Sequence, residues 1–382
     1  MAITKVTGEL VDLNEATSES GLKIPSGTEL NRPTDATGQI RNNTNETSDG
    51  SASCEEYYNG TEWKKINNVA LPVYFKSVTY TGTGSTQSIT GLGFQPDLIW
   101  LKNTSNVANN VWVDSLRGRG TVMYTNSSSQ EAPSPAGTDV ASFDSDGFTL
   151  GTNNNGNINT NGNSYIAYCW RANGGNNSTN TDGTITSTVQ VNDDAGFSIV
   201  QFTTNGNAAS RVGHGLAQTP DVVLYKQSSH SASWWWYTSL IDGSFDYIQF
   251  NGTGAKQNSS GTAFNSTTIF AESGSSGKTM MAYCFYSVAG FSKFGTYTGT
   301  GSSNSITGLG FQPSFVIVKC TSNGPEDWPV FASSLPNNYI AANSDATAQS
   351  FTFSFDSDGF TVPASSGMTN GSGRDYIYFA FK

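Results

Sequence analysis

Short apolar runs alternate along the chain with stretches rich in Gly, Asn, Ser and Thr, and the apolar runs recur in a fixed order. In each set, a run that ends in lysine is followed by an aromatic run, a Ser-Leu pair and a closing apolar run. The lysine-ending runs are residues 98–102, 222–226 and 315–319, and the closing runs are residues 165–170, 280–285 and 376–381. Short apolar runs bounded by turn formers are typical of buried strands. The pattern therefore predicts an all-β chain with three copies of one unit.

Turn motifs mark the same three copies. Residues 80–84 read Tyr-Thr-Gly-Thr-Gly, residues 91–96 read Gly-Leu-Gly-Phe-Gln-Pro, and both motifs return at 297–301 and 308–313. A degenerate version lies at 202–216. A period of roughly 100 residues has the size of a sandwich domain and not of a solenoid repeat. We expect three tandem antiparallel β-sandwich repeats, at residues 71–175, 176–289 and 290–382.

The connections between the copies differ. Residues 173–180 have the composition of a linker, whereas the alternation over 184–191 predicts a strand that turns at 193–196 into a second strand from Phe197. Copy two passes into copy three without linker-like residues. The last two copies are therefore expected to pack as one rigid pair.

The first 70 residues form a separate segment with its own strand signals. Residues 38–42 read as a strand, and residues 54–58 and 61–66 read as a hairpin around Asn59-Gly60, a pair that tolerates the positive φ of a tight turn. The segment has too few apolar residues to form a core alone. We expect residues 1–70 to be an attachment or oligomerisation module. Its candidate contact residues are Ile40, Tyr57, Tyr58, Trp63 and Ile66.

Composition limits the classes of partner. Of the 382 residues 36% are hydrophobic, 12% aromatic and only 13% charged, a balance that argues against disorder. The net charge of −11 argues against nucleic-acid and anionic-membrane partners, because binding phosphates requires clustered Lys and Arg. No apolar run approaches the roughly 20 residues of a membrane helix, so membrane insertion is not expected. With no secretion signal at the N-terminus, we expect synthesis in a cytoplasm.

The four cysteines are expected to be free thiols. Cys169 and Cys284 occupy the same position in successive copies, and equivalent positions of neighbouring domains seldom face each other as a disulfide requires. The cysteine spacing fits no zinc motif, and the chain has only two histidines. Neither a metal nor another cofactor is expected.

The run Trp234-Trp235-Trp236-Tyr237 is the most unusual local feature. Counting back from the Ser-Leu pairs aligns Trp236 with Trp112 and Phe331, which predicts a core position in all three copies. Trp235 and Tyr237 align with valines and are expected on the other apolar face. Trp234 aligns with the polar Asn110, so it is expected near a strand end with access to solvent.

An exposed aromatic ring can stack on a sugar or on a protein partner, because its face offers apolar area and a quadrupole. Trp328, which follows Glu326 and Asp327, is unmatched in the same alignment. For both tryptophans, packing under a loop is favoured over contact with a ligand. The candidate ligand-binding residues are Trp234, Trp328, His230 and Glu326.

Signs of catalysis and of metal binding are poor. Asp-Ser-Asp-Gly occurs at 144–147 and again at 356–359, and Asp-Gly is a standard turn pair, so a hairpin turn is favoured over a calcium site. His214 lies between two glycines and His230 lies in a Ser-rich loop, with no nucleophile motif near either. No catalytic residue is assigned, although 30 acidic residues leave a glycosidase pair open.

Two segments resemble known phage proteins. Ile24-Pro25-Ser26-Gly27-Thr28, Gly38-Gln39-Ile40-Arg41-Asn42 and Tyr58-Asn59-Gly60-Thr61-Glu62-Trp63 are similar to a short module common in phage tail fibres. Over about 71–382, Gly91-Leu92-Gly93-Phe94-Gln95-Pro96-Asp97 and Val288-Ala289-Gly290-Phe291-Ser292-Lys293-Phe294 resemble a domain of unassigned function that occurs in tandem in structural proteins of marine phages. The second resemblance implies jelly-roll, lectin-like sandwiches.

Together, these features favour a virion structural protein of the tail-fibre or adhesin type that binds host-surface polysaccharide or protein without catalysis. Residues 1–70 would join other virion proteins, and analogy with tail fibres favours a homotrimer. A decoration, head-fibre or connector protein is the first alternative, and a tailspike depolymerase is the second.

Overall fold

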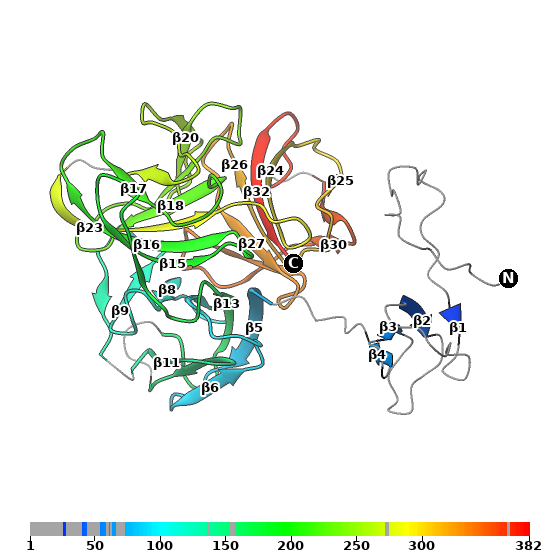
Figure 1. The fold of residues 1–382 in the computed structure, drawn as a ribbon. Coiled ribbons are helices and arrows are strands. Elements are labelled where there is room, and N and C mark those ends of the chain that lie inside the picture. Colours follow the sequence, from blue (N-terminus) through cyan, green and yellow to red (C-terminus); the bar gives the residue numbers. More distant parts are fainter. Residues whose placement is uncertain are drawn as a thin grey trace, which may run out of the picture. The chain divides into compact units, whose positions relative to one another are not determined.

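The computed structural model describes residues 73–382 except 136–137, 153–156, 272–274 and 365–366, and of residues 1–72 it describes the backbone of four short strands together with Thr61. The chain divides into two compact units, Met1–Pro72 and Val73–Lys382. Every regular element in the described residues is a strand (Figure 1). The prediction of an all-β chain is confirmed.

The first unit contains one four-stranded sheet in the order β1-β2-β3-β4. Its strands are β1 (Ser26–Gly27), β2 (Ile40–Asn43), β3 (Cys54–Tyr58) and β4 (Trp63–Lys65). The predicted hairpin is present, but Tyr58 pairs with Trp63, so the second strand begins two residues later than a two-residue turn at Asn59-Gly60 would allow. Ile40, Tyr57, Tyr58 and Trp63 lie on these strands, and Ile66 falls outside the described residues. Their role in attachment stays a prediction.

Copies one and three form the same pair of antiparallel sheets, one of six strands and one of three. In copy one the orders are β10-β9-β8-β7-β13-β5 and β11-β12-β6, and in copy three β24-β32-β26-β27-β28-β29 and β25-β31-β30. The strands of copy one are β5 (Phe75–Thr81), β6 (Gln87–Thr90), β7 (Leu98–Asn103), β8 (Val111–Asp114), β9 (Thr121–Tyr124), β10 (Ala132–Pro133), β11 (Val140–Asp144), β12 (Gly147–Leu150) and β13 (Ser164–Trp170). The strands of copy three are β24 (Ser292–Thr298), β25 (Asn304–Thr307), β26 (Phe315–Cys320), β27 (Pro329–Ala332), β28 (Asn338–Ala341), β29 (Gln349–Ser350), β30 (Ser354–Asp356), β31 (Gly359–Val362) and β32 (Asp375–Phe381).

Copy two has a larger main sheet, in the order β14-β15-β16-β23-β18-β19-β20-β21, and a smaller second sheet of β17 and β22. Its strands are β14 (Ser178–Asn180), β15 (Ser187–Asn192), β16 (Phe197–Asn205), β17 (Arg211–Gly213), β18 (Val222–Gln227), β19 (Trp235–Thr238), β20 (Asp246–Gln249), β21 (Gln257–Asn258), β22 (Thr268–Phe270) and β23 (Ser276–Phe285). The predicted strand pair is confirmed as β15 and β16. The predicted linker is partly wrong, because its last three residues form β14, which pairs with β15.

The two sheets of each copy enclose an apolar cluster in a sandwich-like arrangement. In copy one, Ile99 and Leu101 of β7 meet Ile89 of β6 and Phe148 of β12 inside this cluster. Copies two and three have equivalent clusters around Val223 and Val316. The turn motifs supply the strand ends, since Gly91 and Gly93 adopt φ of 86° and 80°, a conformation that favours glycine.

A fourth apolar cluster lies where the main sheets of the three copies face one another. Leu98 and Trp100 of β7 belong to it, together with Leu224 of β18 and Ile317 of β26. Alternate residues of β7 therefore point into the copy's own cluster and into the shared cluster, and all six residues of the strand are buried. Burial on both faces explains why the lysine-ending runs are continuously apolar and do not alternate with polar residues. Figure 1 shows the three copies as lobes around this centre.

Candidate functional site

The expected exposure of Trp234 and Trp328 is wrong. Their side chains are 0% and 1% exposed and belong to the shared cluster. Strand register explains the error for Trp328, because Ile317 pairs with Val330 as Leu224 pairs with Trp236. Val330, and not Phe331, is therefore the counterpart of Trp236. Copy three has one extra residue before its Ser-Leu pair, which shifted the alignment.

Once the register is corrected, Trp234, Trp328 and Asn110 occupy one position in the three copies. Each reaches a backbone carbonyl of another copy: Trp234 Nε1 donates to Tyr124 O at 2.8 Å, and Trp328 Nε1 donates to Gln249 O at 3.1 Å. Asn110 Nδ2 donates to Ala341 O at 3.1 Å. Copy two thus binds copy one, copy three binds copy two, and copy one binds copy three. These side chains join the copies in a closed cycle and are not available to a ligand.

The lysines that end the apolar runs repeat this cycle. Lys226 Nζ donates to Ser128 O of copy one at 3.1 Å and to Ala232 O of its own copy at 2.5 Å. Lys102 and Lys319 make the equivalent pairs of contacts, with Asp345 O and Thr253 O as the partners in the other copy. Burial lowers the pKa of each lysine to about 8. A buried ammonium needs such fixed acceptors, so the lysines stabilise the junctions between copies.

The other two candidate residues lie apart from each other. Glu326 forms an ion pair with Arg374 at 2.5 Å in copy three. His230 is exposed in copy two, and its Nδ1 lies 2.9 Å from Ser229 Oγ. The structure does not bring the four candidate ligand-binding residues together in one site.

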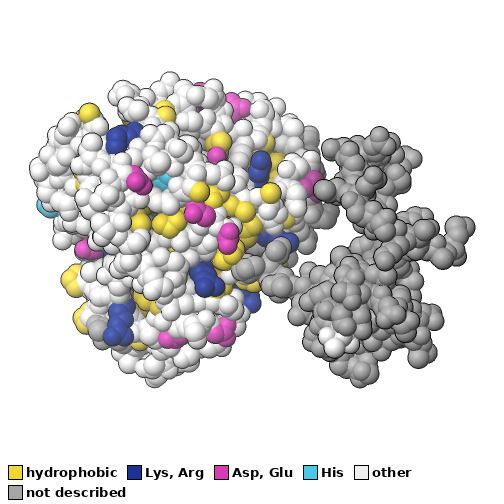
Figure 2. Space-filling model, in the orientation of Figure 1, with side chains coloured by type: hydrophobic (Ala, Val, Ile, Leu, Met, Phe, Trp, Pro, Cys, Tyr) yellow, Lys and Arg dark blue, Asp and Glu magenta, His cyan; other side chains and the backbone are white. Residues whose placement is uncertain are grey.

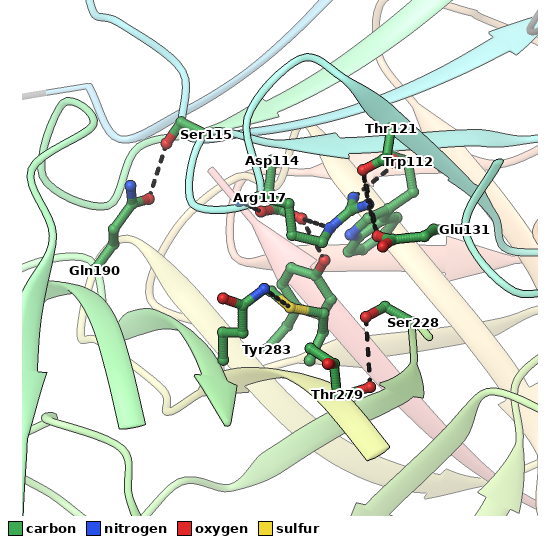
Figure 3. A network of polar contacts seen from close by, with 12 residues as sticks. Trp112, Asp114, Ser115, Arg117, Thr121, Glu131, Gln190, Ser228, Thr279 and Tyr283 are labelled. Carbon is green, nitrogen blue, oxygen red and sulfur yellow. Dashed lines mark hydrogen bonds and ion pairs between the residues drawn. The ribbon is translucent and has the colours of Figure 1, made fainter. Parts of the chain in front are cut away.

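A buried ionic network joins copies one and two (Figure 3). Arg117 Nε and Tyr283 OH each lie 2.7 Å from Asp114 Oδ2, and Arg117 Nη1 lies 3.3 Å from Glu131 Oε2. The side chains of Arg117 and Asp114 are 2% and 0% exposed. Burial raises the pKa of Tyr283 well above its usual value, and Asp114 adds to this effect. Because both carboxylate oxygens of Asp114 accept hydrogen bonds inside the fold, this network is a structural contact.

The Asp-Ser-Asp-Gly segments are hairpin turns, as predicted. Asp144 pairs with Gly147 between β11 and β12. Asp146 accepts from Gly93 N at 2.6 Å and from Gly91 N at 3.0 Å, so its carboxylate caps the Gly-Leu-Gly turn. These hydrogen bonds lower the pKa of Asp146, with Gly93 N–H as the larger cause. In the described residues, no group of three or more His, Cys, Asp or Glu could hold a metal ion.

Copy two lacks this hairpin, and there His214 caps the turn together with Asp193, whose Oδ1 accepts from Ala217 N at 2.8 Å. Leu216 N donates to His214 Nδ1 at 3.1 Å, and His214 Nε2 lies 3.1 Å from Asn265 O. These partners specify the neutral tautomer with the proton on Nε2. Burial lowers the pKa of His214, so it is a neutral structural residue. Cys169, Cys284 and Cys320 are free and buried, which confirms the expectation for these three; the side chain of Cys54 falls outside the described residues.

One pocket of about 150 Å³ opens in copy two. Its floor is the face of the main sheet that points into the cluster of copy two, because the side chains come from alternate positions on the neighbouring strands β16, β23, β18 and β19. The lining residues are Thr204, Tyr225, Gln227, Ala232, Ser233, Trp235, Ser275, Lys278 and Met280. The pocket therefore combines the half-buried ring of Trp235, above the fully buried Tyr225, with hydroxyl, amide and ammonium groups.

One strand position that lines this pocket differs between the copies. Met280 pairs with Gln227 and Phe202, whereas Tyr165 and Tyr376 occupy the same register in copies one and three. There, Tyr165 stacks on Tyr80 with ring centroids 5.0 Å apart, and the pair in copy three has the same separation. The tyrosine rings fill the space that remains open in copy two.

A second position changes with the first. A Cβ added at Gly82 would lie 2.4 Å from the carbonyl oxygen of Thr160 and 2.9 Å from Tyr165 Cε2, so glycine leaves room for both the neighbouring backbone and the ring. The same holds at Gly299, where Gly371 O would lie at 2.3 Å and Tyr376 Cε2 at 2.9 Å. Copy two has Thr204 there, and its Oγ1 donates to Ser275 O at 2.5 Å and accepts from Lys278 N at 3.0 Å. The pair Thr204 and Met280 thus replaces Gly and Tyr and stabilises the pocket edge.

Sequence reasoning placed Trp235 on the second apolar face but missed the pocket. The structure places Trp235 half-buried on that face, with its ring 5.4 Å from the ring of Tyr247. The signal was present in the alignment of the closing runs, where Met280 stands against two tyrosines. It could not be interpreted without knowing that these tyrosines lie over the main sheet.

The surface carries little charge of either sign. On the face shown in Figure 2, Lys and Arg side chains lie singly, with Asp and Glu side chains among them. Such a surface lacks the basic stripe of a nucleic-acid interface on that face. Among the described residues, no helix has the length and apolar character needed to cross a membrane.

The chain matches the family described as a domain of unknown function, DUF7483, over residues 72–382. No curated protein and no solved structure matches the chain. The match covers all three copies and leaves out the first unit.

Proposed function

Because the chain belongs to the DUF7483 family, whose description assigns no activity, we propose a function from its own pocket: it is a binding protein that holds one sugar residue of a host-surface polysaccharide without catalysis. The observation that carries this proposal is the opening in copy two, which copies one and three fill with tyrosine. A site open in one copy of three, and lined by functional side chains, is the candidate for a ligand.

The pocket has the size and chemistry for a single sugar ring. A cavity of about 150 Å³ holds a molecule as large as benzene, with six heavy atoms, so a hexose, with twelve, enters this open pocket with one face and leaves its other substituents outside. Trp235, which is half-buried, offers aromatic surface to the apolar face of such a ring, and the fully buried Tyr225 supports the floor beneath it. Gln227, Ser233 and Ser275 offer hydrogen-bonding groups to its hydroxyls. None of the described lining residues is a carboxylate or a histidine, so these residues supply no acid–base pair for hydrolysis.

We further propose a virion as the setting, on the resemblance of residues 24–63 to tail-fibre modules. In this proposal residues 1–70 attach the protein to other virion proteins and to its own copies in a homotrimer, and residues 71–382 form lectin-like sandwiches that present the pocket to the host. The net charge of −11 and the scattered basic side chains agree with a saccharide or protein partner and disagree with nucleic acid.

The test is binding of the labelled, purified chain to host cells and to an array of bacterial envelope polysaccharides. The key variant is the double substitution Thr204→Gly with Met280→Tyr, which restores the residues of copies one and three and fills the pocket. We expect saturable binding by the natural chain and at least a tenfold loss in this variant.

The matched control is Met280→Leu, which keeps the pocket open at nearly constant volume and should bind like the natural chain. Melting curves check that all variants are folded. Equal binding by the filled variant would refute the site. A folded chain that binds no glycan and no cell would favour the decoration or connector role, and release of sugar fragments would favour the depolymerase.

A further inference from the structure

We propose that the sugar residue recognised by this pocket is acidic, and that Lys278 binds its anionic group. This inference rests on the proposed function and specifies its ligand. Among the described residues that line the pocket, Lys278 is the only charged one. The strand β23 places it two residues before Met280, so both side chains project from the same face of the main sheet.

The copies differ at this position in how the side chain is used. Arg374 is the counterpart of Lys278 in copy three, and it pairs with Glu326 at 2.5 Å. Asn163 is the counterpart in copy one, and its Oδ1 accepts from Asn106 Nδ2 at 2.9 Å. In copy two, no described residue forms an ion pair or hydrogen bond with Lys278 Nζ. Copy two thus offers an ammonium group at the place where copy three neutralises its cation internally.

The surroundings of Lys278 favour an anion over further water. The backbone N–H of Lys278 is held by Thr204 Oγ1 at 3.0 Å, which anchors the strand at the pocket edge. Gln227, paired with Met280 across the strands, has a side-chain amide for which no described residue is a partner, and it can donate to the same anion. An ammonium and an amide around one oxyanion form charge-assisted hydrogen bonds, which are stronger than neutral ones.

The net charge of −11 does not prevent the pocket from binding an anionic sugar. At physiological ionic strength, charges more than about 8 Å away are largely screened. A contact ion pair inside a partly enclosed pocket is screened much less. The local cation therefore decides the sign of the ligand, while distant carboxylates mainly slow its approach. A uronic-acid carboxylate, a sulfate ester and a phosphate ester share the required chemistry.

The test uses the full chain on an array of envelope polysaccharides sorted into acidic and neutral members. Bound members are tested again after chemical reduction of their carboxyl groups, and separately after removal of sulfate or phosphate esters. We expect every bound polysaccharide to be acidic, and one of the two treatments to abolish binding, which identifies the anion.

Two variants test the residue. Lys278→Gln removes the charge and should weaken binding at least tenfold and reduce its dependence on salt, whereas Lys278→Arg keeps the charge and should stay within about threefold. Melting curves confirm folding. Binding of neutral glycans, or equal binding by Lys278→Gln, would overturn this inference while leaving the pocket in place, whereas unchanged binding by the Thr204→Gly, Met280→Tyr variant would refute the proposed function itself.

Discussion

At the scale of single residues, the three copies act as internal controls for one another. Tyr165 and Tyr376 are buried and stacked, whereas Met280 at the same register leaves a pocket. The same backbone position therefore supports a closed core in two copies and an open site in the third. Such a difference within one chain separates the contribution of a side chain from that of the fold.

His214 makes the stability of copy two dependent on pH. Burial lowers its pKa, so the unfolded chain binds the proton more readily than the folded chain. The contribution to stability is fully present above the unfolded pKa of about 6.5 and is lost as the pH falls through the lowered pKa of the folded state. We therefore expect the free energy of unfolding to be lower at pH 5.5 than at pH 7.5, with His214 contributing to the difference.

The measurement is urea unfolding of the natural chain and of His214→Thr at both pH values. Threonine is the residue of copies one and three at this position. The variant should be less stable at pH 7.5, by about 1–3 kcal/mol, because Leu216 N and Asn265 O lose their partner. Its free energy of unfolding should also change less between the two pH values than that of the natural chain. An identical pH dependence in both proteins would show that His214 is not the titrating group.

At the scale of elements, short polar contacts set the ends of the strands. The turn between β6 and β7 contains two glycines with positive φ, and the hairpin of β11 and β12 reaches across to cap it with the carboxylate of Asp146. Asp358 caps the equivalent turn of copy three at 2.7 and 3.0 Å. The motifs Gly-Leu-Gly and Asp-Ser-Asp-Gly, far apart in sequence, are therefore two halves of one contact.

Removing this carboxylate should loosen the turn it caps. We expect Asp146→Ala to lower the melting temperature and to speed hydrogen exchange at the amides of Gly91 and Gly93. Asp146→Asn should have a smaller effect, because an amide retains one acceptor oxygen. The control is Ser145→Ala, an exposed neighbour in the same turn, which should leave both amides protected. Equal exchange in all four proteins would contradict the role of the cap.

Most of these elements could be predicted from the sequence, since apolar runs and turn motifs record them locally. The Asp-Ser-Asp-Gly hairpin and the strands β15 and β16 are examples. Register could not be predicted reliably: one extra residue before Ser334 displaced Trp328 from its true counterpart, Trp234. Side-chain alternation has a period of two, so a shift of one residue assigns a side chain to the wrong face.

At the scale of the whole molecule, residues 73–382 form one unit because their copies share apolar surface. The shared cluster contains large aromatic rings from every copy. Trp236 is the clearest case, with its ring centroid 5.1 Å from that of Trp328 and 5.7 Å from that of Phe250. A copy separated from the others would expose this surface to water.

We therefore expect residues 73–382 to unfold in one cooperative transition. Calorimetry should give equal calorimetric and van't Hoff enthalpies for this transition. Trp236→Ala should destabilise the whole unit by about 3–5 kcal/mol, as for other large core residues, and should move the entire transition to lower temperature. Separate transitions, of which the substitution moves only one, would show that the copies unfold independently.

The candidate site was harder to predict than the fold for a physical reason. Sequence reasoning identified unusual aromatic residues and assumed that a tryptophan aligned with Asn110 would be exposed. The shared cluster buries that position, and Trp234 and Asn110 both face a neighbouring copy there. At the pocket, copy two has Met280 where the other copies have a tyrosine ring. A missing ring produces no sequence motif that could be searched for. Only the packing of Tyr165 and Tyr376 shows what Met280 leaves open.

In this cycle of contacts each copy contacts both of the others, so the copies that are neighbours in space are not only those that are neighbours in the sequence. Copy one contacts copy three as well as copy two. The ring centroid of Phe75, in the first strand of copy one, lies 5.2 Å from that of Phe381, in the last strand of copy three. Both ends of residues 73–382 therefore lie close together. They could be connected by a short linker, and new termini could be made in the connection between copies one and two or between copies two and three, while all three contacts between copies remain. The architecture therefore permits circular permutation, and the numbering of its copies from one to three records only where the chain is open.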